Sequence, residues 1–142
     1  MILLVVDASV ALKWFFQDRY NEEDCNLALA ILYGVDEGRI RLMQPPHFIA
    51  EVAAVLTREK PDEAEDDLFD LLNIESCVAN EPEIYTTAID LAARYRYHLF
   101  DTLYHAVALN TPGTTLITAD TAYYRKAEGS GRILLLKDYI PV

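Results

Sequence analysis

The chain has 142 residues, 52% of them hydrophobic, and we expect one domain spanning residues 1–142 with a substantial core. Its formal net charge of −11 argues against a general nucleic-acid-binding protein, because phosphate contacts normally need a basic surface. The apolar run at the N-terminus ends at Asp7 and is too short for a signal peptide or membrane span. Two isolated cysteines without CxxC spacing indicate reduced thiols in a cytoplasmic protein.

Short apolar runs alternate with longer helical patterns along the chain, which is typical of an α/β domain with a mainly parallel sheet. The predicted strands cover residues 2–6, 39–43, 76–79, 115–118 and 133–136. The predicted helices cover residues 8–17, 22–37, 46–59, 61–73, 82–97, 101–110 and 122–127. Prolines mark three of the helix starts, where a missing backbone N–H carries no penalty.

Two aspartates follow predicted strands. Asp7 comes directly after residues 2–6, and Asp120 stands in the same relation to residues 115–118. The carboxyl ends of parallel strands meet at one edge of the sheet, which is where such sheets bind their ligands. Either aspartate could instead cap the helix that follows it, and Ser9 could take that role in place of Asp7.

Glu51 lies in a segment, residues 48–56, that is otherwise almost entirely apolar. The pattern predicts a helix that is buried on most of its faces. A carboxylate in such a place costs several kcal/mol unless it is ion-paired, hydrogen-bonded or bound to a cation. The alternative to a metal or catalytic role is an ion pair with Arg58 or Lys13, although Arg58 is two helical turns away.

Asp101 begins another apolar helical segment, where a carboxylate also suits the positive end of the helix dipole or caps the helix. Tyr104 and His105 share its helix face, because they follow at the spacing of one turn. His105 could support the carboxylate or simply fill the core.

A site that brings all four carboxylates together must take up protons or bind a cation, because the negative charges repel one another. Like charges about 4 Å apart repel by about 4 kcal/mol at an effective dielectric constant of about 20. Hard oxygen ligands favour Mg²⁺ or Mn²⁺, which can activate water for phosphodiester cleavage. The sequence has no zinc-binding His/Cys cluster, phosphate-binding loop, dinucleotide fingerprint or nucleophile elbow. Metal-assisted hydrolysis is therefore the chemistry that the pattern predicts.

Four segments carry a family resemblance. They are residues 6–10 with Lys13 and Trp14, residues 50–52, residues 100–108 and residues 117–120. In this order and at these separations they resemble the PIN-domain family, above all the VapC-type toxins of prokaryotic toxin–antitoxin pairs. The resemblance spans the whole chain. It implies a three-layer α/β/α fold with a mainly parallel central sheet, and a Mg²⁺- or Mn²⁺-dependent endoribonuclease.

The resemblance also implies residue roles and partners. The acidic positions of the family fall on Asp7, Glu51, Asp101 and Asp120, and its small polar helpers near the metal fall on Ser9 and Thr118. An RNA substrate, an antitoxin protein whose tail can enter the metal groove, and a second copy in a homodimer would be the partners. Ala54 departs from the family, which usually has asparagine three residues after the glutamate. Thr102 replaces the usual small residue after Asp101.

Two other classes of function stay open. A PIN-like module could bind an antitoxin yet cut RNA slowly or not at all, and the low basic content and Ala54 favour this alternative. A phosphatase of the haloacid dehalogenase type also begins with an aspartate at a strand end. It needs a second aspartate two residues later, where this chain has Ser9. A receiver domain would not explain Glu51.

Overall fold

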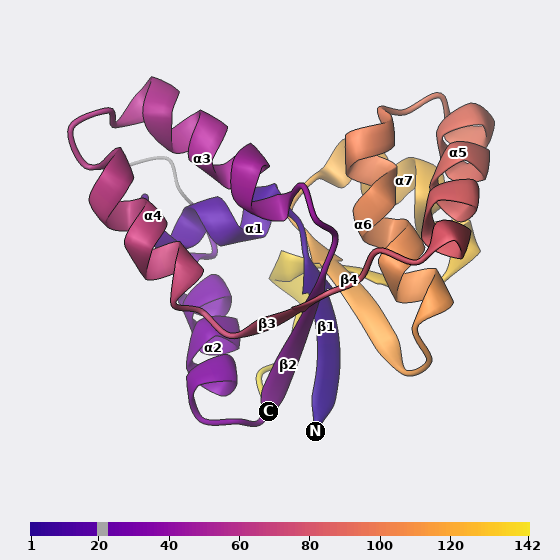
Figure 1. Ribbon diagram of the computed structural model, residues 1–142. Coiled ribbons are helices and arrows are strands. Elements are labelled where there is room, and N and C mark those ends of the chain that lie inside the picture. The colour runs from indigo at the N-terminus through magenta and orange to yellow at the C-terminus, as the bar shows by residue number, and fades with distance from the viewer. Residues whose placement is uncertain (20–22) are drawn as a thin grey trace.

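The structure is a computed structural model that describes residues 1–19 and 23–142. A five-stranded sheet forms its centre, with the strand order β3-β2-β1-β4-β5 (Figure 1). Every strand pairing is parallel, which confirms the predicted sheet. The strands are β1 (Ile2–Val6), β2 (Ile40–Gln44), β3 (Ser76–Val78), β4 (Thr114–Thr118) and β5 (Ile133–Leu135).

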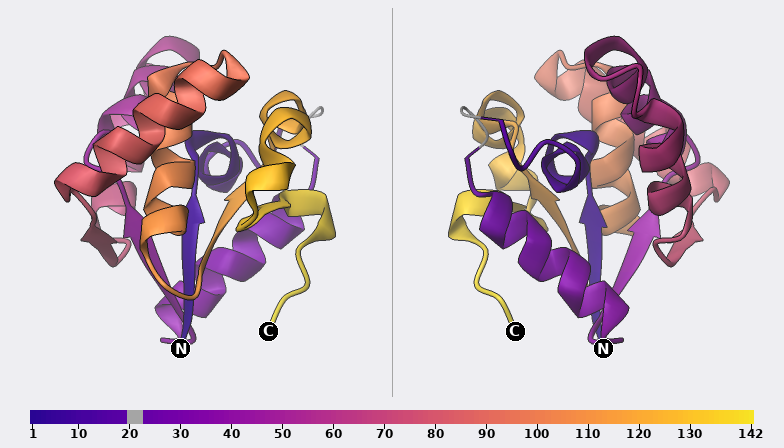
Figure 2. Two further views of the ribbon diagram at one scale, coloured as in Figure 1. Left: turned by 90° about the vertical axis from the view of Figure 1, so that its right-hand side faces the viewer. Right: turned by 90° about the vertical axis from the view of Figure 1, so that its left-hand side faces the viewer.

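Helices cover both faces of the sheet and complete the expected three-layer α/β/α fold. Figure 2 shows α5 and α6 on one side of the sheet and α2 on the other. The helices are α1 (Ala8–Ala11), α2 (Cys25–Asp36), α3 (Phe48–Glu59), α4 (Ala64–Leu72), α5 (Pro82–Tyr95), α6 (Leu99–Asn110) and α7 (Thr121–Ala127). Among the described residues there is no helix with the length and apolar character that crossing a membrane requires.

Helix α6 is the central helix of the core. Residues 102–108 are all buried, because α6 packs on the sheet and α5 covers it from outside. The hydroxyl of Thr102 donates a hydrogen bond to the backbone oxygen of Ala88 in α5, at 2.9 Å. The polar group that Thr102 brings into the core is therefore satisfied.

Several predicted helix ends were wrong. The helix predicted at 8–17 is α1 followed by a 3-10 turn, Leu12–Trp14, and the one predicted from Pro61 begins only at Ala64. The helix predicted at 46–59 begins two residues later, at Phe48. The helix predicted at 82–97 ends at Tyr95, because Arg96 adopts a left-handed conformation with φ 52°. The helix predicted at 22–37 begins at Cys25, and residue 22 lies outside the described residues.

Helix α3 is less buried than its sequence predicts. Only Phe48, Val52 and Leu56 are buried, which is one stripe of the helix, while Ala50 and Ala54 are exposed. The reason is that α3 and α4 form an arm that projects beyond the sheet (Figure 1). One face of α3 therefore remains open to solvent.

Candidate metal centre

Asp7 lies where the structure brings two strand ends together. Strands β1 and β4 are neighbours, with Val6 paired to Ile117. One carboxylate oxygen of Asp7 accepts a hydrogen bond from the backbone N–H of Val10 at 3.3 Å and caps α1. The hydroxyls of Ser9 and Thr118 also donate to the carboxylate. Asp7 is therefore a helix cap and a candidate ligand at once, so these two interpretations do not compete.

Asp120 has the same double role at the end of β4. Its Oδ1 accepts from the backbone N–H of Tyr123 at 3.0 Å and caps α7, and its Oδ2 accepts from the hydroxyl of Tyr97 at 2.7 Å. The hydroxyl of Thr118 accepts from the backbone N–H of Asp120 at 3.0 Å while it donates to Asp7. Thr118 thus joins both aspartates through one oxygen.

Glu51 reaches the site from α3. The hydroxyl of Tyr104 donates to its Oε1 at 3.0 Å, and Nε2 of His47 lies 3.8 Å from its Oε2. Arg58 instead pairs with Glu59, at 3.4 Å, so the alternative interpretation, an ion pair between Arg58 and Glu51, is wrong. Among the described residues, no lysine or arginine forms an ion pair with any of the four carboxylates.

Asp101 is the third residue of α6. The cap position belongs to His98, with no capping side-chain hydrogen bond there, so the capping interpretation of Asp101 is wrong. Burial and the nearby charge of Asp120 raise the pKa of Asp101. Its position in the first turn still suits the positive end of the helix dipole.

The carboxylates are close enough to influence one another. Burial, with a smaller contribution from the charge of Asp120, raises the pKa of Asp7 to about 6. Burial and then the charges of Asp101 and Asp7 raise the pKa of Glu51 to about 7. Near these carboxylates the structure records two histidines, His47 beside Glu51 and His98, whose charge acts to lower the pKa of Asp101, but no lysine or arginine ion pair among the described residues. The negative charge held together here therefore favours a bound cation.

The donor set fits a divalent ion that keeps part of its hydration shell. Within the part of the chain that the structure describes, no three acidic, histidine or cysteine side chains stand close enough to hold an ion together directly. Mg²⁺ typically uses one or two protein carboxylates and retains several waters, so it does not need a complete protein cage. Carboxylate and hydroxyl oxygens from Asp7, Asp120 and their neighbours are the ligands that it prefers.

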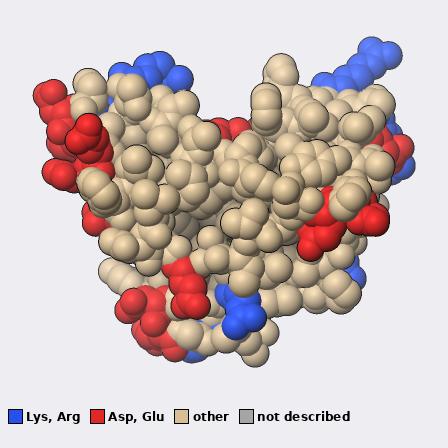
Figure 3. Space-filling model, in the orientation of Figure 1, with Lys and Arg blue, Asp and Glu red and all other residues tan. Residues whose placement is uncertain are grey.

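The helices that carry Glu51 and Asp101, α3 and α6, lie on opposite sides of a notch in the molecular surface. Figure 3 shows the notch between the arm of α3 and α4 and the lobe of α5 and α6, with acidic side chains at its floor. Lysine and arginine side chains stand at the top of each lobe in the same view (Figure 3). The acidic chain therefore presents basic groups on either side of the notch.

Gln44 supports the site, and its only signal in the sequence is that a polar residue ends an apolar strand. Its buried side-chain amide donates to the backbone oxygen of Val6 at 2.7 Å and accepts from the N–H of Val6 at 3.0 Å. The side chain thus replaces a backbone partner for the residue directly before Asp7. This pairing fixes the end of β1.

His105 is a core residue. Its Nε2 donates to the backbone oxygen of Gly131 at 2.8 Å, since a carbonyl only accepts, and Nδ1 therefore accepts from the hydroxyl of Tyr123, also at 2.8 Å. Burial lowers the pKa of His105, which agrees with a neutral ring. Nδ1 thus joins α6 to α7, and Nε2 joins α6 to the loop at Gly131, so the core interpretation of His105 is confirmed.

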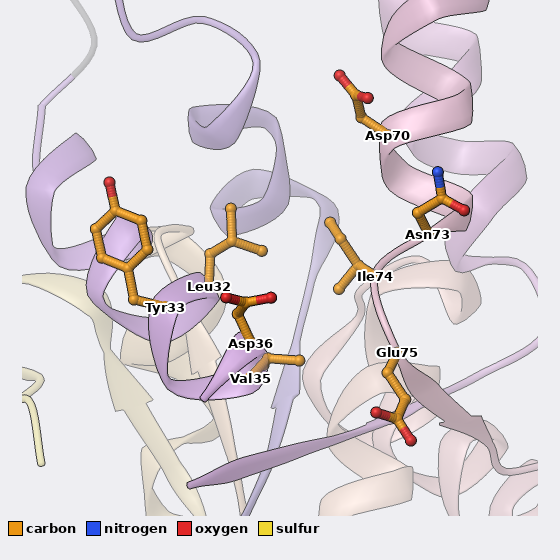
Figure 4. Close-up of a pocket in the computed structure, with 8 residues that line it drawn as sticks. All are labelled: Leu32, Tyr33, Val35, Asp36, Asp70, Asn73, Ile74 and Glu75. Carbon is orange, nitrogen blue, oxygen red and sulfur yellow. The ribbon is translucent and has the colours of Figure 1, made fainter. Parts of the chain in front are cut away.

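A second hollow lies away from the carboxylates. Two adjoining cavities of about 420 and 450 Å³ share Leu32, Asp70 and Ile74 as lining residues. Figure 4 shows the first of them between α2 and the end of α4, with apolar side chains inside and Asp36, Asp70 and Glu75 around it. The two cavities together form an apolar groove with acidic edges, here termed the α2–α4 groove.

The fold and the carboxylate site together define a PIN domain. The sequence matches the PIN domain family over residues 4–129, and the chain belongs to this family. PIN domains are generally nucleases, and they typically use divalent metal ions. No curated protein matches the sequence significantly.

Solved structures share the fold at low sequence identity. The chain is similar to PAE2754 from Pyrobaculum aerophilum, with 18% identity, a TM-score of 0.63 and coverage of 96% of this chain and 92% of that chain. It is also similar to VapBC-1 from nontypeable Haemophilus influenzae, with 11% identity, a TM-score of 0.68 and coverage of 96% and 100%. A third similar structure is VapBC2 from Rickettsia felis bound to a DNA fragment from their promoter, with 11% identity, a TM-score of 0.65 and coverage of 94% and 97%.

Proposed function

We propose that this chain is an endoribonuclease that hydrolyses RNA phosphodiester bonds with Mg²⁺ or Mn²⁺. The observation that carries the proposal is that Asp7, Glu51, Asp101 and Asp120 influence one another electrostatically without a lysine or arginine partner among the described residues. Asp7 and Asp101 would be direct ligands, and Glu51 and Asp120 would complete the shell directly or through water. A bound ion would activate the attacking water and stabilise the leaving oxygen.

Hydroxyl groups around the carboxylates would hold them in place for metal binding. The hydroxyls of Ser9 and Thr118 donate to Asp7 and thereby favour its charged form. The hydroxyl of Tyr97 donates to one oxygen of Asp120 and holds that carboxylate in place. The basic side chains at the tops of the two lobes would contact the RNA backbone on either side of the notch (Figure 3).

Cleavage of an RNA pool in the presence of Mn²⁺ tests the proposal, with chelator and Asp7→Asn as the two interventions. Asparagine caps a helix about as well as aspartate, so Asp7→Asn removes the charge while α1 keeps its cap. We expect activity to fall by about 100-fold or more, because a bound metal ion contributes several kcal/mol to the transition state. Asp62→Asn, in the exposed turn before α4, is the matched control and should leave activity unchanged. Cleavage that survives chelation or Asp7→Asn would overturn the mechanism.

We further propose that the chain is the toxin of a cytoplasmic toxin–antitoxin pair and forms a homodimer. The two VapBC structures support this proposal through their fold, and the α2–α4 groove supports a protein partner. A basic amphipathic segment would fit the groove, because the lining is apolar and Asp36, Asp70 and Glu75 stand at its edges.

Coexpression with the protein encoded by the adjacent reading frame tests the pairing. We expect the two proteins to copurify and the partner to block RNA cleavage, and Asp70→Lys to weaken the complex at least about 10-fold. Sedimentation of the free chain reports whether a homodimer forms without the partner. An adjacent protein that neither binds nor inhibits would overturn the pairing but not the nuclease.

The alternative function is a PIN-like module that binds its partner and cuts weakly. Ala54 favours it, because this exposed position one turn after Glu51 offers no polar group to the site. Metal titration combined with the cleavage assay distinguishes the two functions. Tight Mn²⁺ binding without cleavage of any RNA would favour the binding module.

A further inference from the structure

Tyr104 connects the two helices that carry Glu51 and Asp101. It lies on α6 one turn after Asp101, and its side chain is fully buried, with 0% exposed. Its hydroxyl crosses to α3 and donates to Oε1 of Glu51 at 3.0 Å. A fully buried side chain thus donates to the carboxylate of Glu51, whose side chain is 29% exposed to solvent.

His47 makes the reciprocal connection. It lies one turn before Glu51, and its Nε2 donates to the backbone oxygen of Phe100 at 2.8 Å, since that oxygen only accepts. Phe100 directly precedes Asp101, so this bond ties the beginning of α3 to the segment that places Asp101. The imidazole also packs on the ring of Tyr104, with 4.7 Å between centroids.

Packing alone does not explain these two polar groups. The rings of Phe48 and Tyr104 meet edge to face at 6.4 Å, and a phenylalanine at position 104 would keep that contact. A buried hydroxyl is unfavourable unless it is hydrogen-bonded, and the bond recorded for this one goes to Glu51. The hydroxyl of Tyr104 thus orients the carboxylate of Glu51, and the ring provides the apolar contact.

We propose that Tyr104 and His47 are positioning residues that set the carboxylate of Glu51 relative to Asp101 for a divalent cation. The inference rests on the proposed metal centre. The two bonds run in opposite directions between the helices, from α6 to Glu51 and from the start of α3 to Phe100. Together they resist both a rotation of the Glu51 side chain and a separation of the two walls of the notch.

Calorimetric titration of the metal-free protein with Mn²⁺ tests the role of Tyr104 without relying on cleavage. Tyr104→Phe should weaken Mn²⁺ binding about 10-fold, the lower end of the loss that follows removal of a group bonded to a metal ligand. Tyr95→Phe is the matched control, because it removes a hydroxyl that bonds Ser130 instead of a site carboxylate. It should bind Mn²⁺ like the wild type.

A double-mutant cycle shows whether Tyr104 acts through Glu51. In the Glu51→Gln background, Tyr104→Phe should cause no further loss of Mn²⁺ affinity. Equal losses in the two backgrounds would overturn the proposal. Should Tyr104→Phe fail to fold, His47→Phe still tests the bridge, since it keeps the ring, removes the bond to Phe100 and should also weaken Mn²⁺ binding.

The outcomes separate this inference from the proposed function. Wild-type protein that does not bind Mn²⁺ would overturn the metal centre and, with it, the positioning role. Wild-type protein that binds Mn²⁺, together with Tyr104→Phe and His47→Phe variants of unchanged affinity, would overturn the positioning role alone. Weaker binding in both variants, with Tyr95→Phe unchanged, would support it.

Discussion

Thr118 donates its hydroxyl hydrogen to Asp7 across 111 positions of sequence. The bond joins the ends of β1 and β4, which lie side by side in the sheet. The same hydroxyl oxygen accepts from the backbone N–H of Asp120 at 3.0 Å. A single buried hydroxyl thus aligns the two strand ends from which both aspartates emerge.

Thr118→Val should therefore damage both folding and metal binding. Valine has nearly the same shape, so the substitution removes the hydrogen bond to the charged Asp7 and leaves the Asp120 N–H without its acceptor. We expect the free energy of unfolding at pH 8 to fall by about 2 kcal/mol, and Mn²⁺ affinity to fall about 10-fold. Urea denaturation and calorimetry measure the two effects.

Thr114→Val on the same strand is the control. Thr114 is also buried, with 1% exposed, but its hydroxyl has no hydrogen-bond partner among residues 1–19 and 23–142. Replacing this hydroxyl by a methyl group should leave stability unchanged or increase it, and Mn²⁺ affinity should not change. Similar losses in the two valine variants would show that the Asp7 bond is not the cause.

Asp7→Asn should make the metal-free protein more stable at neutral pH. Burial raises the pKa of Asp7 to about 6, whereas the pKa of an aspartate in the unfolded chain is near 3.8. The stability that protonated Asp7 provides is therefore fully present below pH 3.8 and is lost as the pH rises through about 6. Asparagine stays neutral throughout. The variant and the wild type should be equally stable near pH 4, and the variant should gain up to about 3 kcal/mol by pH 8.

Denaturation at a series of pH values in chelator measures this difference. Because only the difference in free energy of unfolding between the variant and the wild type is used, the contributions of the other titrating groups largely cancel. Saturating Mn²⁺ should reverse the order at pH 8, since a cation stabilises only the wild-type carboxylate. A constant difference from pH 4 to pH 8 would contradict the raised pKa of Asp7.

Gln44→Met should be one of the most destabilising single changes near the site. The side-chain amide of Gln44 satisfies both the N–H and the C=O of Val6, and methionine of similar length satisfies neither. Two buried backbone groups without partners should reduce the free energy of unfolding by about 3 kcal/mol. Gln17→Met, on the exposed segment after Trp14, should change it by less than about 0.5 kcal/mol.

Arg96→Gly should stabilise the protein. Arg96 ends α5 in the left-handed region, with φ 52°, where a side chain costs roughly 1 kcal/mol and glycine fits without strain. We expect a gain of about 1 kcal/mol in urea denaturation. Arg94→Gly lies inside the same helix and should have the opposite effect, because glycine is unfavourable there and the pair with Asp90 is lost.

The sequence was sufficient for the parts of the fold that depend on local pattern. Apolar runs of strand length identified the five strands, and the polar residues that follow two of them located Asp7 and Asp120 at one edge of the sheet. Helix ends were harder to predict, because they depend on single backbone conformations. Arg96 terminates α5 in a left-handed conformation that favours glycine, and nothing in its side chain signals this.

The support around the carboxylates could not be predicted, because it depends on contacts between distant segments. Tyr97 is 23 residues from Asp120, and Tyr104 is 53 residues from Glu51. A tyrosine in an apolar helix looks the same in sequence whether its hydroxyl meets a carboxylate or a backbone carbonyl. The exposure of α3 was also missed, since its apolar composition does not reveal that it projects beyond the sheet.

The double role of Asp7 and Asp120 has an evolutionary consequence. Each carboxylate caps a helix with one oxygen, and asparagine can do the same. Aspartate and asparagine codons differ by one base, so a single mutation can remove the charge and leave the helix cap intact. Under the proposed function, inactive but well-folded descendants of this protein are therefore one step away, and loss of activity would be easy to select wherever RNA cleavage harms the cell.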